Sequence, residues 1–198
     1  MLMDLERQKE NFRNHVATFT DYGNIKILDF KEPGSSHYRI RFLFEEDYYR
    51  LHISGDLGEL IASNYNNMCY EKFSDFVRDT GYFETKIDCC NRAIYFWDYD
   101  KAKEDLRRIF KENEIEFYPE RWDDRTPEEI MEETIVDILE DLNGNSGLGS
   151  RGYDLLSDYV CFEYCESIGK AETGILELYM LAFELAQEQL SKNKGGEN

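Results

Sequence analysis

The sequence predicts an α+β protein in which an N-terminal helix and a small antiparallel sheet pack on helices, followed by an acidic helical C-terminal part. Three observations predict this class. Residues 37–54 alternate between apolar and polar side chains, as strands do, whereas apolar residues recur at helical spacing after residue 98. Hydrophobic residues make up 41% and aromatic residues 15% of the 198-residue chain, enough for a sizeable core.

The first elements follow from periodicity. Residues 3–19 carry apolar side chains at roughly helical spacing, so we expect a helix that stops before Gly23. Residues 24–30, NIKILDF, predict a strand. Residues 32–36, EPGSS, have the composition of a turn.

Residues 37–54 predict a β-hairpin with a defined register. Pairing Phe44 with Tyr49, Phe42 with Leu51 and Ile40 with Ile53 makes one face wholly apolar, and a slip by one residue would mix polar side chains into it. The opposite face then becomes basic, and its residues are His37, Arg39, Arg41, Arg50 and His52.

The segment Ser54-Gly55-Asp56-Leu57-Gly58 ends the hairpin, and it has two interpretations. Both glycines can adopt positive φ and an aspartate suits a turn, which indicates a corner. A functional loop is the alternative, because Asp56 lies beside the end of the basic face. Residues 59–65 fit a short helix or another strand.

The rest of the chain is mainly helical. We expect a short helix over 70–83 that ends at Gly81, strands over 83–87 and 93–97, and a helix from Asp98 or Asp100 to Asn113. Pro119 breaks the pattern and suggests a domain of residues 1–118 and an acidic region of residues 119–198, which could also pack as one unit with the first. That region predicts three helices: one from the Thr126-Pro127-Glu128-Glu129 capping box to Leu142, then 152–167 and 171–191.

Charge is the strongest functional signal. The net charge is −19, and residues 98–198 hold 26 acids against 11 lysines and arginines. Such a region repels nucleic acid and anionic membranes and attracts basic surfaces, although solubility alone also explains an acidic surface.

The acids are densest in the helix expected after Thr126. Met131, Ile135, Ile138 and Leu142 form its apolar stripe, and Glu129, Glu133, Asp137 and Glu140 fall on the opposite face. Steps of four residues rise about 6 Å, close to the spacing of phosphates, so this face can imitate the charges of DNA. The predicted binding residues are Glu129, Glu132, Glu133, Asp137, Glu140 and Asp141.

No catalytic, metal or cofactor motif occurs. The five cysteines lack disulfide-like or zinc-like spacing, so we expect free thiols packed as small apolar groups, and neither metal nor cofactor. We expect a cytoplasmic protein, since neither a signal peptide nor a membrane span is recognisable. An acid–base pair of His52 and Asp56 beside the arginines gives an alternative, an RNA- or nucleotide-directed hydrolase, unless acidic side chains cover the basic face.

The stretches FRNHVATF, DFKEPGSSHYRIRFLF and HISGDLGE resemble small phage, prophage and plasmid proteins of Gram-positive bacteria, over residues 10–100. Among such proteins, acidic ones of this size are often anti-CRISPR or anti-restriction factors. The resemblance implies a non-enzymatic inhibitor of a basic nucleic-acid-binding host protein, such as Cas9 or its guide-RNA complex. Direct binding of nucleic acid is expected only through Arg39, Arg41 and Arg50 of the basic face. An interaction or regulatory module unrelated to nucleic acid is a further alternative.

Overall fold

The computed structural model describes residues 4–195, except for the side-chain surroundings of residues 5, 162, 163, 194 and 195. About 40% of the chain is helical and 22% is strand, which confirms the α+β class. The described chain forms two compact units. Unit 1 comprises the residues up to Ile94 and those from Gly174 onward, and unit 2 comprises Tyr95–Thr173.

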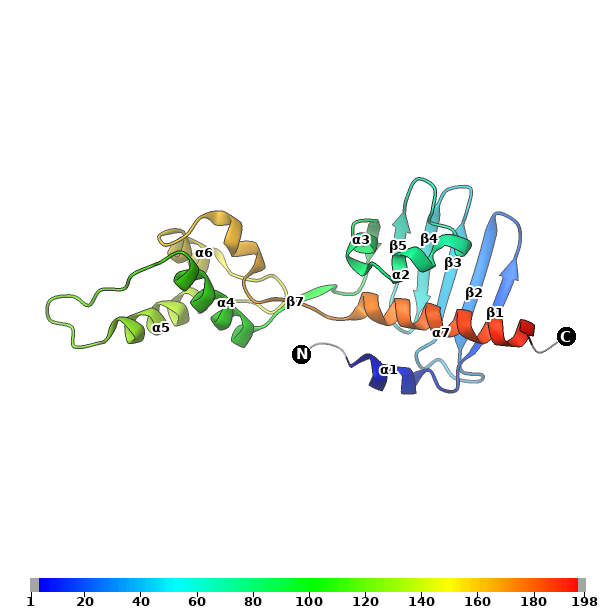
Figure 1. The fold of residues 1–198 in the computed structure, drawn as a ribbon, viewed down its shortest axis with the longest axis horizontal. Helices are drawn as coiled ribbons and strands as arrows, with labels where there is room; N and C mark the ends of the chain where they lie inside the picture. Colours follow the sequence, from blue (N-terminus) through cyan, green and yellow to red (C-terminus); the bar gives the residue numbers. More distant parts are fainter. Residues whose placement is uncertain (1–3, 196–198) are drawn as a thin grey trace. The chain divides into compact units, whose positions relative to one another are not determined.

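Unit 1 contains an antiparallel meander in which each strand pairs with the next along the chain (Figure 1). Its strands are β1 (Val16–Asp21), β2 (Ile25–Lys31), β3 (Ile40–Glu45), β4 (Arg50–Gly55), β5 (Leu60–Ser63) and β6 (Ile87–Cys90). Alternate residues of β2, β3, β4 and β5 are buried, as the sequence pattern predicts for a sheet with one covered face.

Helices cover one face of this sheet. They are the 3-10 helix η1 (Tyr70–Lys72), α2 (Ser74–Val77), α3 (Thr80–Glu84) and the long C-terminal helix α7 (Ile175–Gly195). The N-terminal helix α1 (Leu5–Asn11) packs beside α7. Figure 1 shows α7 crossing the sheet, and the ring of Phe183 lies 5.3 Å from that of Phe42 and 4.8 Å from that of Phe73. A cluster of aromatic rings therefore joins the last helix to the central strands.

The N-terminal prediction was wrong in part, because the helix ends at Asn11 and Val16–Asp21 form β1. Ala17 is buried and Phe19 is half-buried, so the apolar residues of this segment serve a strand face rather than a helix stripe. Pairing with β2 also satisfies the backbone hydrogen-bonding groups of this segment, which contains the β-branched residues valine and threonine.

The hairpin is confirmed, with a register two residues away from the expected one. Phe42 pairs with Ile53 and Phe44 with Leu51, across a four-residue turn of residues 46–49. A shift of two residues keeps every side chain on its face, so the predicted burial of Phe42 and Leu51 holds.

The segment after β4 is a corner. Gly55 has φ of 143°, and a Cβ atom there would lie 2.1 Å from the backbone oxygen of Arg39, so only glycine fits. The backbone nitrogen of Asp56 donates to the same oxygen at 2.8 Å. Tyr179 of α7 donates its hydroxyl to the oxygen of Leu57 at 3.1 Å, which fixes the corner to the core.

Between β5 and β6, the single helix expected over 70–83 is three short elements: η1, α2 and α3. Gly81 lies inside α3 instead of ending a helix, and the strand expected over 83–87 begins at Ile87. Phe73, Phe76 and Phe83 are fully buried, so packing of these rings decides where the chain turns.

Unit 2 has its own core. It contains β7 (Tyr95–Trp97), α4 (Tyr99–Glu112), α5 (Pro127–Ile138), α6 (Ser150–Ser157), the 3-10 helix η2 (Phe162–Ser167) and β8 (Lys170–Glu172), which pairs with β7. Asp98 caps α4, and Thr126 and Glu129 form the expected capping box of α5. The inward residues predicted for α4 are buried: Ala102, Leu106, Ile109 and Phe110.

The expected boundary at residue 118 differs from the observed division, which falls after Ile94. The segment 119–198 is not one region of three helices: α5 and α6 belong to unit 2, whereas α7 belongs to unit 1. Periodicity identified the apolar residues of α7, but it could not show that they pack on strands located more than 100 residues earlier in the chain.

Candidate functional site

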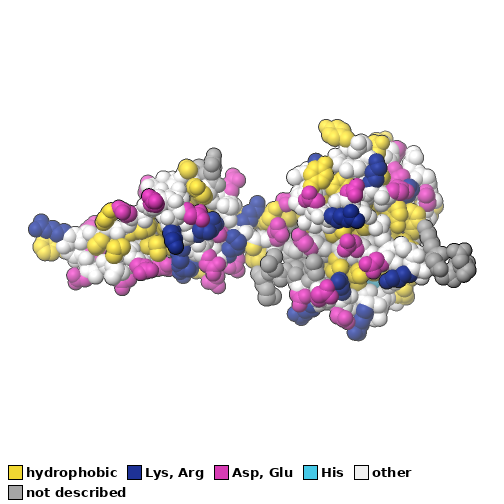
Figure 2. Space-filling view, viewed as in Figure 1, with side chains coloured by type: hydrophobic (Ala, Val, Ile, Leu, Met, Phe, Trp, Pro, Cys, Tyr) yellow, Lys and Arg dark blue, Asp and Glu magenta, His cyan; other side chains and the backbone are white. Residues whose placement is uncertain are grey.

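Negative charge is concentrated in unit 2. Residues 95–173 hold 22 acids against 9 lysines and arginines, a net charge of −13, which leaves −6 of the total −19 for the rest of the chain. Figure 2 shows acidic and basic side chains interspersed with apolar ones on the visible face of this unit. The acids outnumber the bases by enough to leave a strong negative field.

The acidic face of α5 points outward as expected. Glu129, Glu133 and Asp137 are exposed, as is Glu140 just beyond the helix. On the opposite side Ile135 and Ile138 are fully buried, whereas Met131 is half-buried. Leu142 is also half-buried, and it lies beyond the helix, which ends four residues earlier than predicted.

Most of the six predicted binding residues already have contacts within the chain. Glu129 completes the capping box, and Asp141 accepts hydrogen bonds from the backbone nitrogens of Arg151 and Gly152 at the start of α6. The other contacts are ion pairs with arginines: Glu132 with Arg107, Glu133 with Arg125, and Glu140 with Arg151. Within residues 4–195, Asp137 alone of the six has a side chain without such a contact. The charge ladder is therefore partly neutralised.

Residues 113–126, between α4 and α5, form a long connection, in which the sequence predicts only a domain boundary near Pro119. Its Tyr118 is 73% exposed and its Trp122 is 88% exposed, with the guanidinium of Arg121 over the indole at 5.3 Å. Arg125 holds the pKa of Asp123 at about 2, so this acid stays charged over the whole physiological range. A tryptophan in an irregular acidic stretch was the signal that could have revealed this loop.

The expected basic sheet face contains acids as well as arginines. Arg41 makes two hydrogen bonds to Asp29, at 2.7 and 2.8 Å, and His52 contacts Glu45 at 3.0 Å. Arg50 lies opposite Glu45 in the register. His37 and Arg39 precede β3 and lie in a turn, so they are not strand residues as predicted.

A shallow groove of about 600 Å³ lies on this face and includes Arg41, His52 and Cys89 among its lining residues. The structure does not pair His52 with Asp56. The His52 ring contacts Glu45, whereas Asp56 accepts a hydrogen bond from the backbone nitrogen of Tyr38 at 3.0 Å. The hydrolase alternative thus lacks the acid–base pair on which it was based.

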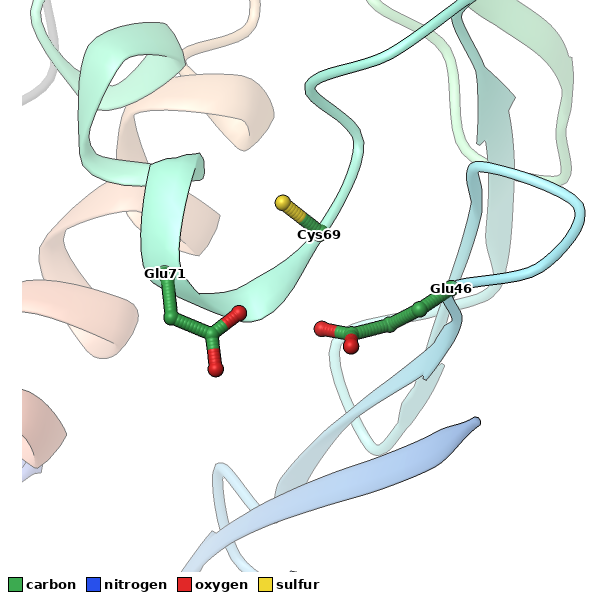
Figure 3. Close-up of side chains that lie close together, drawn as sticks. All are labelled: Glu46, Cys69 and Glu71. Carbon is green, nitrogen blue, oxygen red and sulfur yellow. The ribbon is translucent and has the colours of Figure 1, made fainter. Parts of the chain in front are cut away.

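Three side chains at one end of the sheet have the chemistry of a metal site. Ligand atoms of Glu46, Cys69 and Glu71 lie within 4.8 Å of one another, and Figure 3 shows the two carboxylates facing across a gap. The ammonium of Lys26 contacts both carboxylates, at 3.0 Å for Glu46. Hydrogen bonding to Glu71 and Glu46 raises the pKa of Lys26, and Lys26 lowers that of Glu71. Lys26 therefore supplies the positive charge that a metal would bring.

The cysteines are all free, as expected, but their surroundings differ from the prediction. Only Cys165 is buried, and burial raises the pKa of its thiol. Cys89 and Cys161 are exposed. Among the described residues, no helix is both long and apolar enough for a membrane crossing.

A scan against protein-family models found no matching family, and searches of curated proteins and of solved structures likewise found no match. The resemblance to mobile-element proteins therefore stays an expectation from the sequence.

Proposed function

We propose that the chain is a non-enzymatic inhibitor that binds a nucleic-acid-handling protein through the acidic surface of unit 2. The observation that carries this proposal is the placement of charge, with −13 of the total −19 on residues 95–173. Proteins that bind nucleic acids line their channels with lysine and arginine. An acidic protein surface competes for such a channel and is drawn to it over long distances.

Exposed apolar groups within the acidic surface support a docking role. Trp122 and Tyr118 on the connection, and Val136 on the outer side of α5, are all exposed. Tryptophan and tyrosine dominate the energy of protein interfaces because they bury large areas on binding. Charge would bring the partner close, and these side chains would slow its release.

The internal ion pairs of α5 are compatible with binding. Exposed pairs contribute only about 0–1 kcal/mol each, so lysines and arginines of a partner can replace the internal arginines. Acids without a side-chain contact in the described chain are available at once, and these include Asp124, Glu128 and Asp137. We therefore place the first contacts at these three residues rather than at Glu129, which the helix cap requires.

The resemblance over residues 10–100 adds a target class. We propose a CRISPR effector such as Cas9, or its guide-RNA complex, as the partner, and a mobile element that acts in the bacterial cytoplasm as the source of the chain. In this proposal the acidic surface imitates DNA and occupies the nucleic-acid channel of the effector.

The test is charge reversal with a matched control. The variant Asp124→Lys/Glu128→Lys/Asp137→Lys changes unit 2, and Glu59→Lys/Asp75→Lys/Asp88→Lys makes the same change in net charge on exposed positions of unit 1. Glu128 and Asp75 both lie in the first turn of a helix, which matches the two sets further.

Binding to Cas9 and inhibition of its DNA cleavage are measured at two salt concentrations. We expect the unit 2 variant to bind at least tenfold more weakly, the control to change by about twofold, and wild-type binding to weaken as salt rises. If both variants lost affinity for Cas9 equally, net charge alone, and not its placement on unit 2, would explain the binding. Absence of wild-type binding to Cas9 and its guide-RNA complex would remove the target class.

A further inference from the structure

Four exposed tyrosines gather at one end of the unit 1 sheet. Tyr22 is 70% exposed and lies in the β1–β2 turn, Tyr48 (70%) and Tyr49 (38%) lie in the β3–β4 turn, and Tyr65 (93%) follows β5. In an antiparallel meander these three connections occur at the same end of the sheet, as the strand order shows and Figure 1 illustrates. We call these residues the tyrosine end.

Backbone hydrogen bonds join the three connections into one surface. The nitrogen of Glu46 donates to the oxygen of Asn24 at 2.8 Å, which links the first turn to the second. The nitrogen of Asn64 donates to the oxygen of Tyr49 at 3.1 Å, which links the second turn to the third connection. The tyrosines are therefore held on neighbouring segments rather than on independent loops.

Ion pairs, a hydrogen bond and ring stacking hold the residues beneath the tyrosine end in place. Lys26 is buried and joins Glu46 of the β3–β4 turn to Glu71 of η1. Glu46 also accepts a hydrogen bond from the backbone nitrogen of Tyr70 at 3.2 Å, and the ring of Tyr70 stacks on Phe19 at 4.3 Å. These contacts give Glu46 and Glu71, two members of the cluster in Figure 3, a structural role. They also hold the neighbouring turns in place, which reduces the entropy that a partner must overcome on binding there.

Outside the tyrosine end, the exposed aromatic side chains of the described residues already have partners. Lys86 lies over Tyr82 at 4.4 Å, and Lys103 lies over Tyr99 at 5.0 Å. Arg121 covers Trp122, and the hydroxyl of Tyr118 bonds to Glu116. Within the described part of the chain, the side chains of the tyrosine end have no cation, ring or hydrogen-bond partner. Cations thus cover the exposed rings of Tyr82, Tyr99 and Trp122, whereas no cation covers the rings of the tyrosine end or of Tyr118 among the described residues.

The charges around the tyrosine end are mainly negative. Asp21 and Asp47 are exposed and precede Tyr22 and Tyr48 in the sequence, and the exposed base next to the β3–β4 turn is Arg50, the first residue of β4. Tyrosine side chains provide contact area at low entropy cost and are the main residues of many protein-binding loops. Rings next to carboxylates favour a cation, whose charge is attracted both to the ring face and to the acids.

We propose that the tyrosine end is a docking surface for a protein partner that presents arginine or lysine side chains, which stack on these four rings. This proposal is independent of the one for unit 2, because it depends on other residues in the other unit. Nucleic acid also stacks on aromatic rings, but Asp21 and Asp47 would repel its phosphates. A basic protein surface satisfies both the rings and the acids.

The test uses the full chain labelled with 3-fluorotyrosine, whose ¹⁹F resonances are assigned by single Tyr→Phe changes. The probe is the peptide acetyl-Gly-Arg-Gly-Arg-Gly-amide, and its counterpart with glutamine in place of arginine is the control. We expect the arginine peptide to shift the resonances of Tyr22, Tyr48, Tyr49 and Tyr65 more than those of Tyr82 and Tyr99, whose faces are already covered. Because the readout is specific for each ring, peptide bound at the acids of unit 2 does not obscure it.

Two variants sharpen the result. Tyr22→Ser/Tyr48→Ser should weaken binding at the remaining two rings by about two- to fivefold for each ring lost. Asp21→Asn/Asp47→Asn should weaken it about two- to threefold while keeping the side-chain oxygen that accepts from the Gly23 nitrogen. Both changes lie at exposed turns, so the fold tolerates them.

Four outcomes would overturn the proposal. Shifts no larger than those of Tyr82 and Tyr99 would show that the rings are ordinary surface residues. Equal shifts with the glutamine peptide would show that the cation is not needed for binding. Stronger shifts with a ten-residue oligothymidine would show that the tyrosine end binds nucleic acid rather than a basic protein. Shifts that depend on protein concentration without peptide would indicate a second copy of this chain.

Discussion

The two units stabilise themselves in different ways. Unit 1 has a core of aromatic rings between a sheet and α7, and its buried charge, Lys26, is held by two carboxylates. Unit 2 has a smaller core of mostly aliphatic residues and places its arginines in exposed pairs with acids. Buried packing therefore stabilises both units, with more aromatic rings in unit 1, whereas the exposed ion pairs of unit 2 add only about 0–1 kcal/mol each.

This difference also separates the functional surfaces. Unit 1 offers tyrosines on turns that a well-packed sheet holds in place, whereas unit 2 offers charge on a helix and on a long connection. The chain passes from unit 1 into unit 2 after Ile94 and returns at Gly174 to supply α7. Unit 2 is thus an insertion between the last strand of the sheet and the helix that covers it.

The largest expected effect is on the core of unit 1. Phe183→Ala should lower the free energy of unfolding of unit 1 by about 3–5 kcal/mol, because the ring contacts Phe42, Phe44 and Phe73. Both tryptophans, Trp97 and Trp122, lie in unit 2, so tryptophan fluorescence reports on that unit alone. Urea unfolding followed by fluorescence and by far-UV circular dichroism measures the two units side by side.

The matched change in unit 2 is Leu106→Ala, at a fully buried position of α4, with an expected loss of about 2–5 kcal/mol. We expect the fluorescence transition to move with Leu106→Ala and to stay in place with Phe183→Ala. A fluorescence transition that moves equally in both variants would contradict the separation into two cores.

The buried lysine gives the next effect. Lys26→Met should destabilise unit 1 by about 2 kcal/mol, because Glu46 and Glu71 then face each other without a cation. The side chain of Glu71 is partly exposed, so the loss is smaller than for a fully buried ion pair. Since Lys26 lowers the pKa of Glu71, wild-type stability from this contact is lost as the pH falls below about 4.5. The triple change Lys26→Met/Glu46→Gln/Glu71→Gln should restore most of the loss. If Lys26→Met were as stable as the wild type in urea, the ion pairs of Lys26 with Glu46 and Glu71 would not stabilise unit 1.

Capping gives a smaller effect, in unit 2. Glu129→Ala should cost about 1 kcal/mol, because it removes one half of the capping box of α5. Glu129→Gln keeps a capping group and should cost less. The fluorescence-detected unfolding midpoint checks both variants, and equal losses would show that the charge of Glu129 matters more than its hydrogen bond.

The smallest effect concerns pH and unit 1. His15 is buried, its Nδ1 has no hydrogen-bond partner, and burial lowers its pKa below 6.5. The unfolded chain therefore takes up a proton first as the pH falls, so stability declines as the pH falls through 6.5, by less than about 1 kcal/mol between pH 6.5 and 5.5. His15→Phe should flatten this dependence in urea unfolding at pH 6.5 and 5.5. An unchanged slope in the variant would assign it to other groups.

Local patterns predicted much of this fold. Alternation in residues 40–55 gave the buried face of the hairpin, and the Thr126–Glu129 sequence gave the start of α5, because both signals depend on neighbouring residues. The placement of α7 on the sheet and the strand nature of Val16–Asp21 depend on contacts distant in the chain, which a single sequence does not show.

The candidate sites followed the same rule. Charge counting located the acidic surface, but not the arginines that pair with Glu132, Glu133 and Glu140. The basic face was predicted from one hairpin, and Asp29 on the neighbouring strand was overlooked because its register was unknown. The tyrosine end was missed because its residues come from three separate turns.

Hydrogen exchange of the full chain, alone and mixed with Cas9, tests most directly whether unit 2 is the docking surface. We expect exchange to slow in residues 113–141, which include the exposed connection and α5, and the slowing to diminish at high salt. Slowing confined to the β3 and β4 strands that carry Arg41 and Arg50, with residues 113–141 unchanged, would show that the partner docks on unit 1 and not on unit 2.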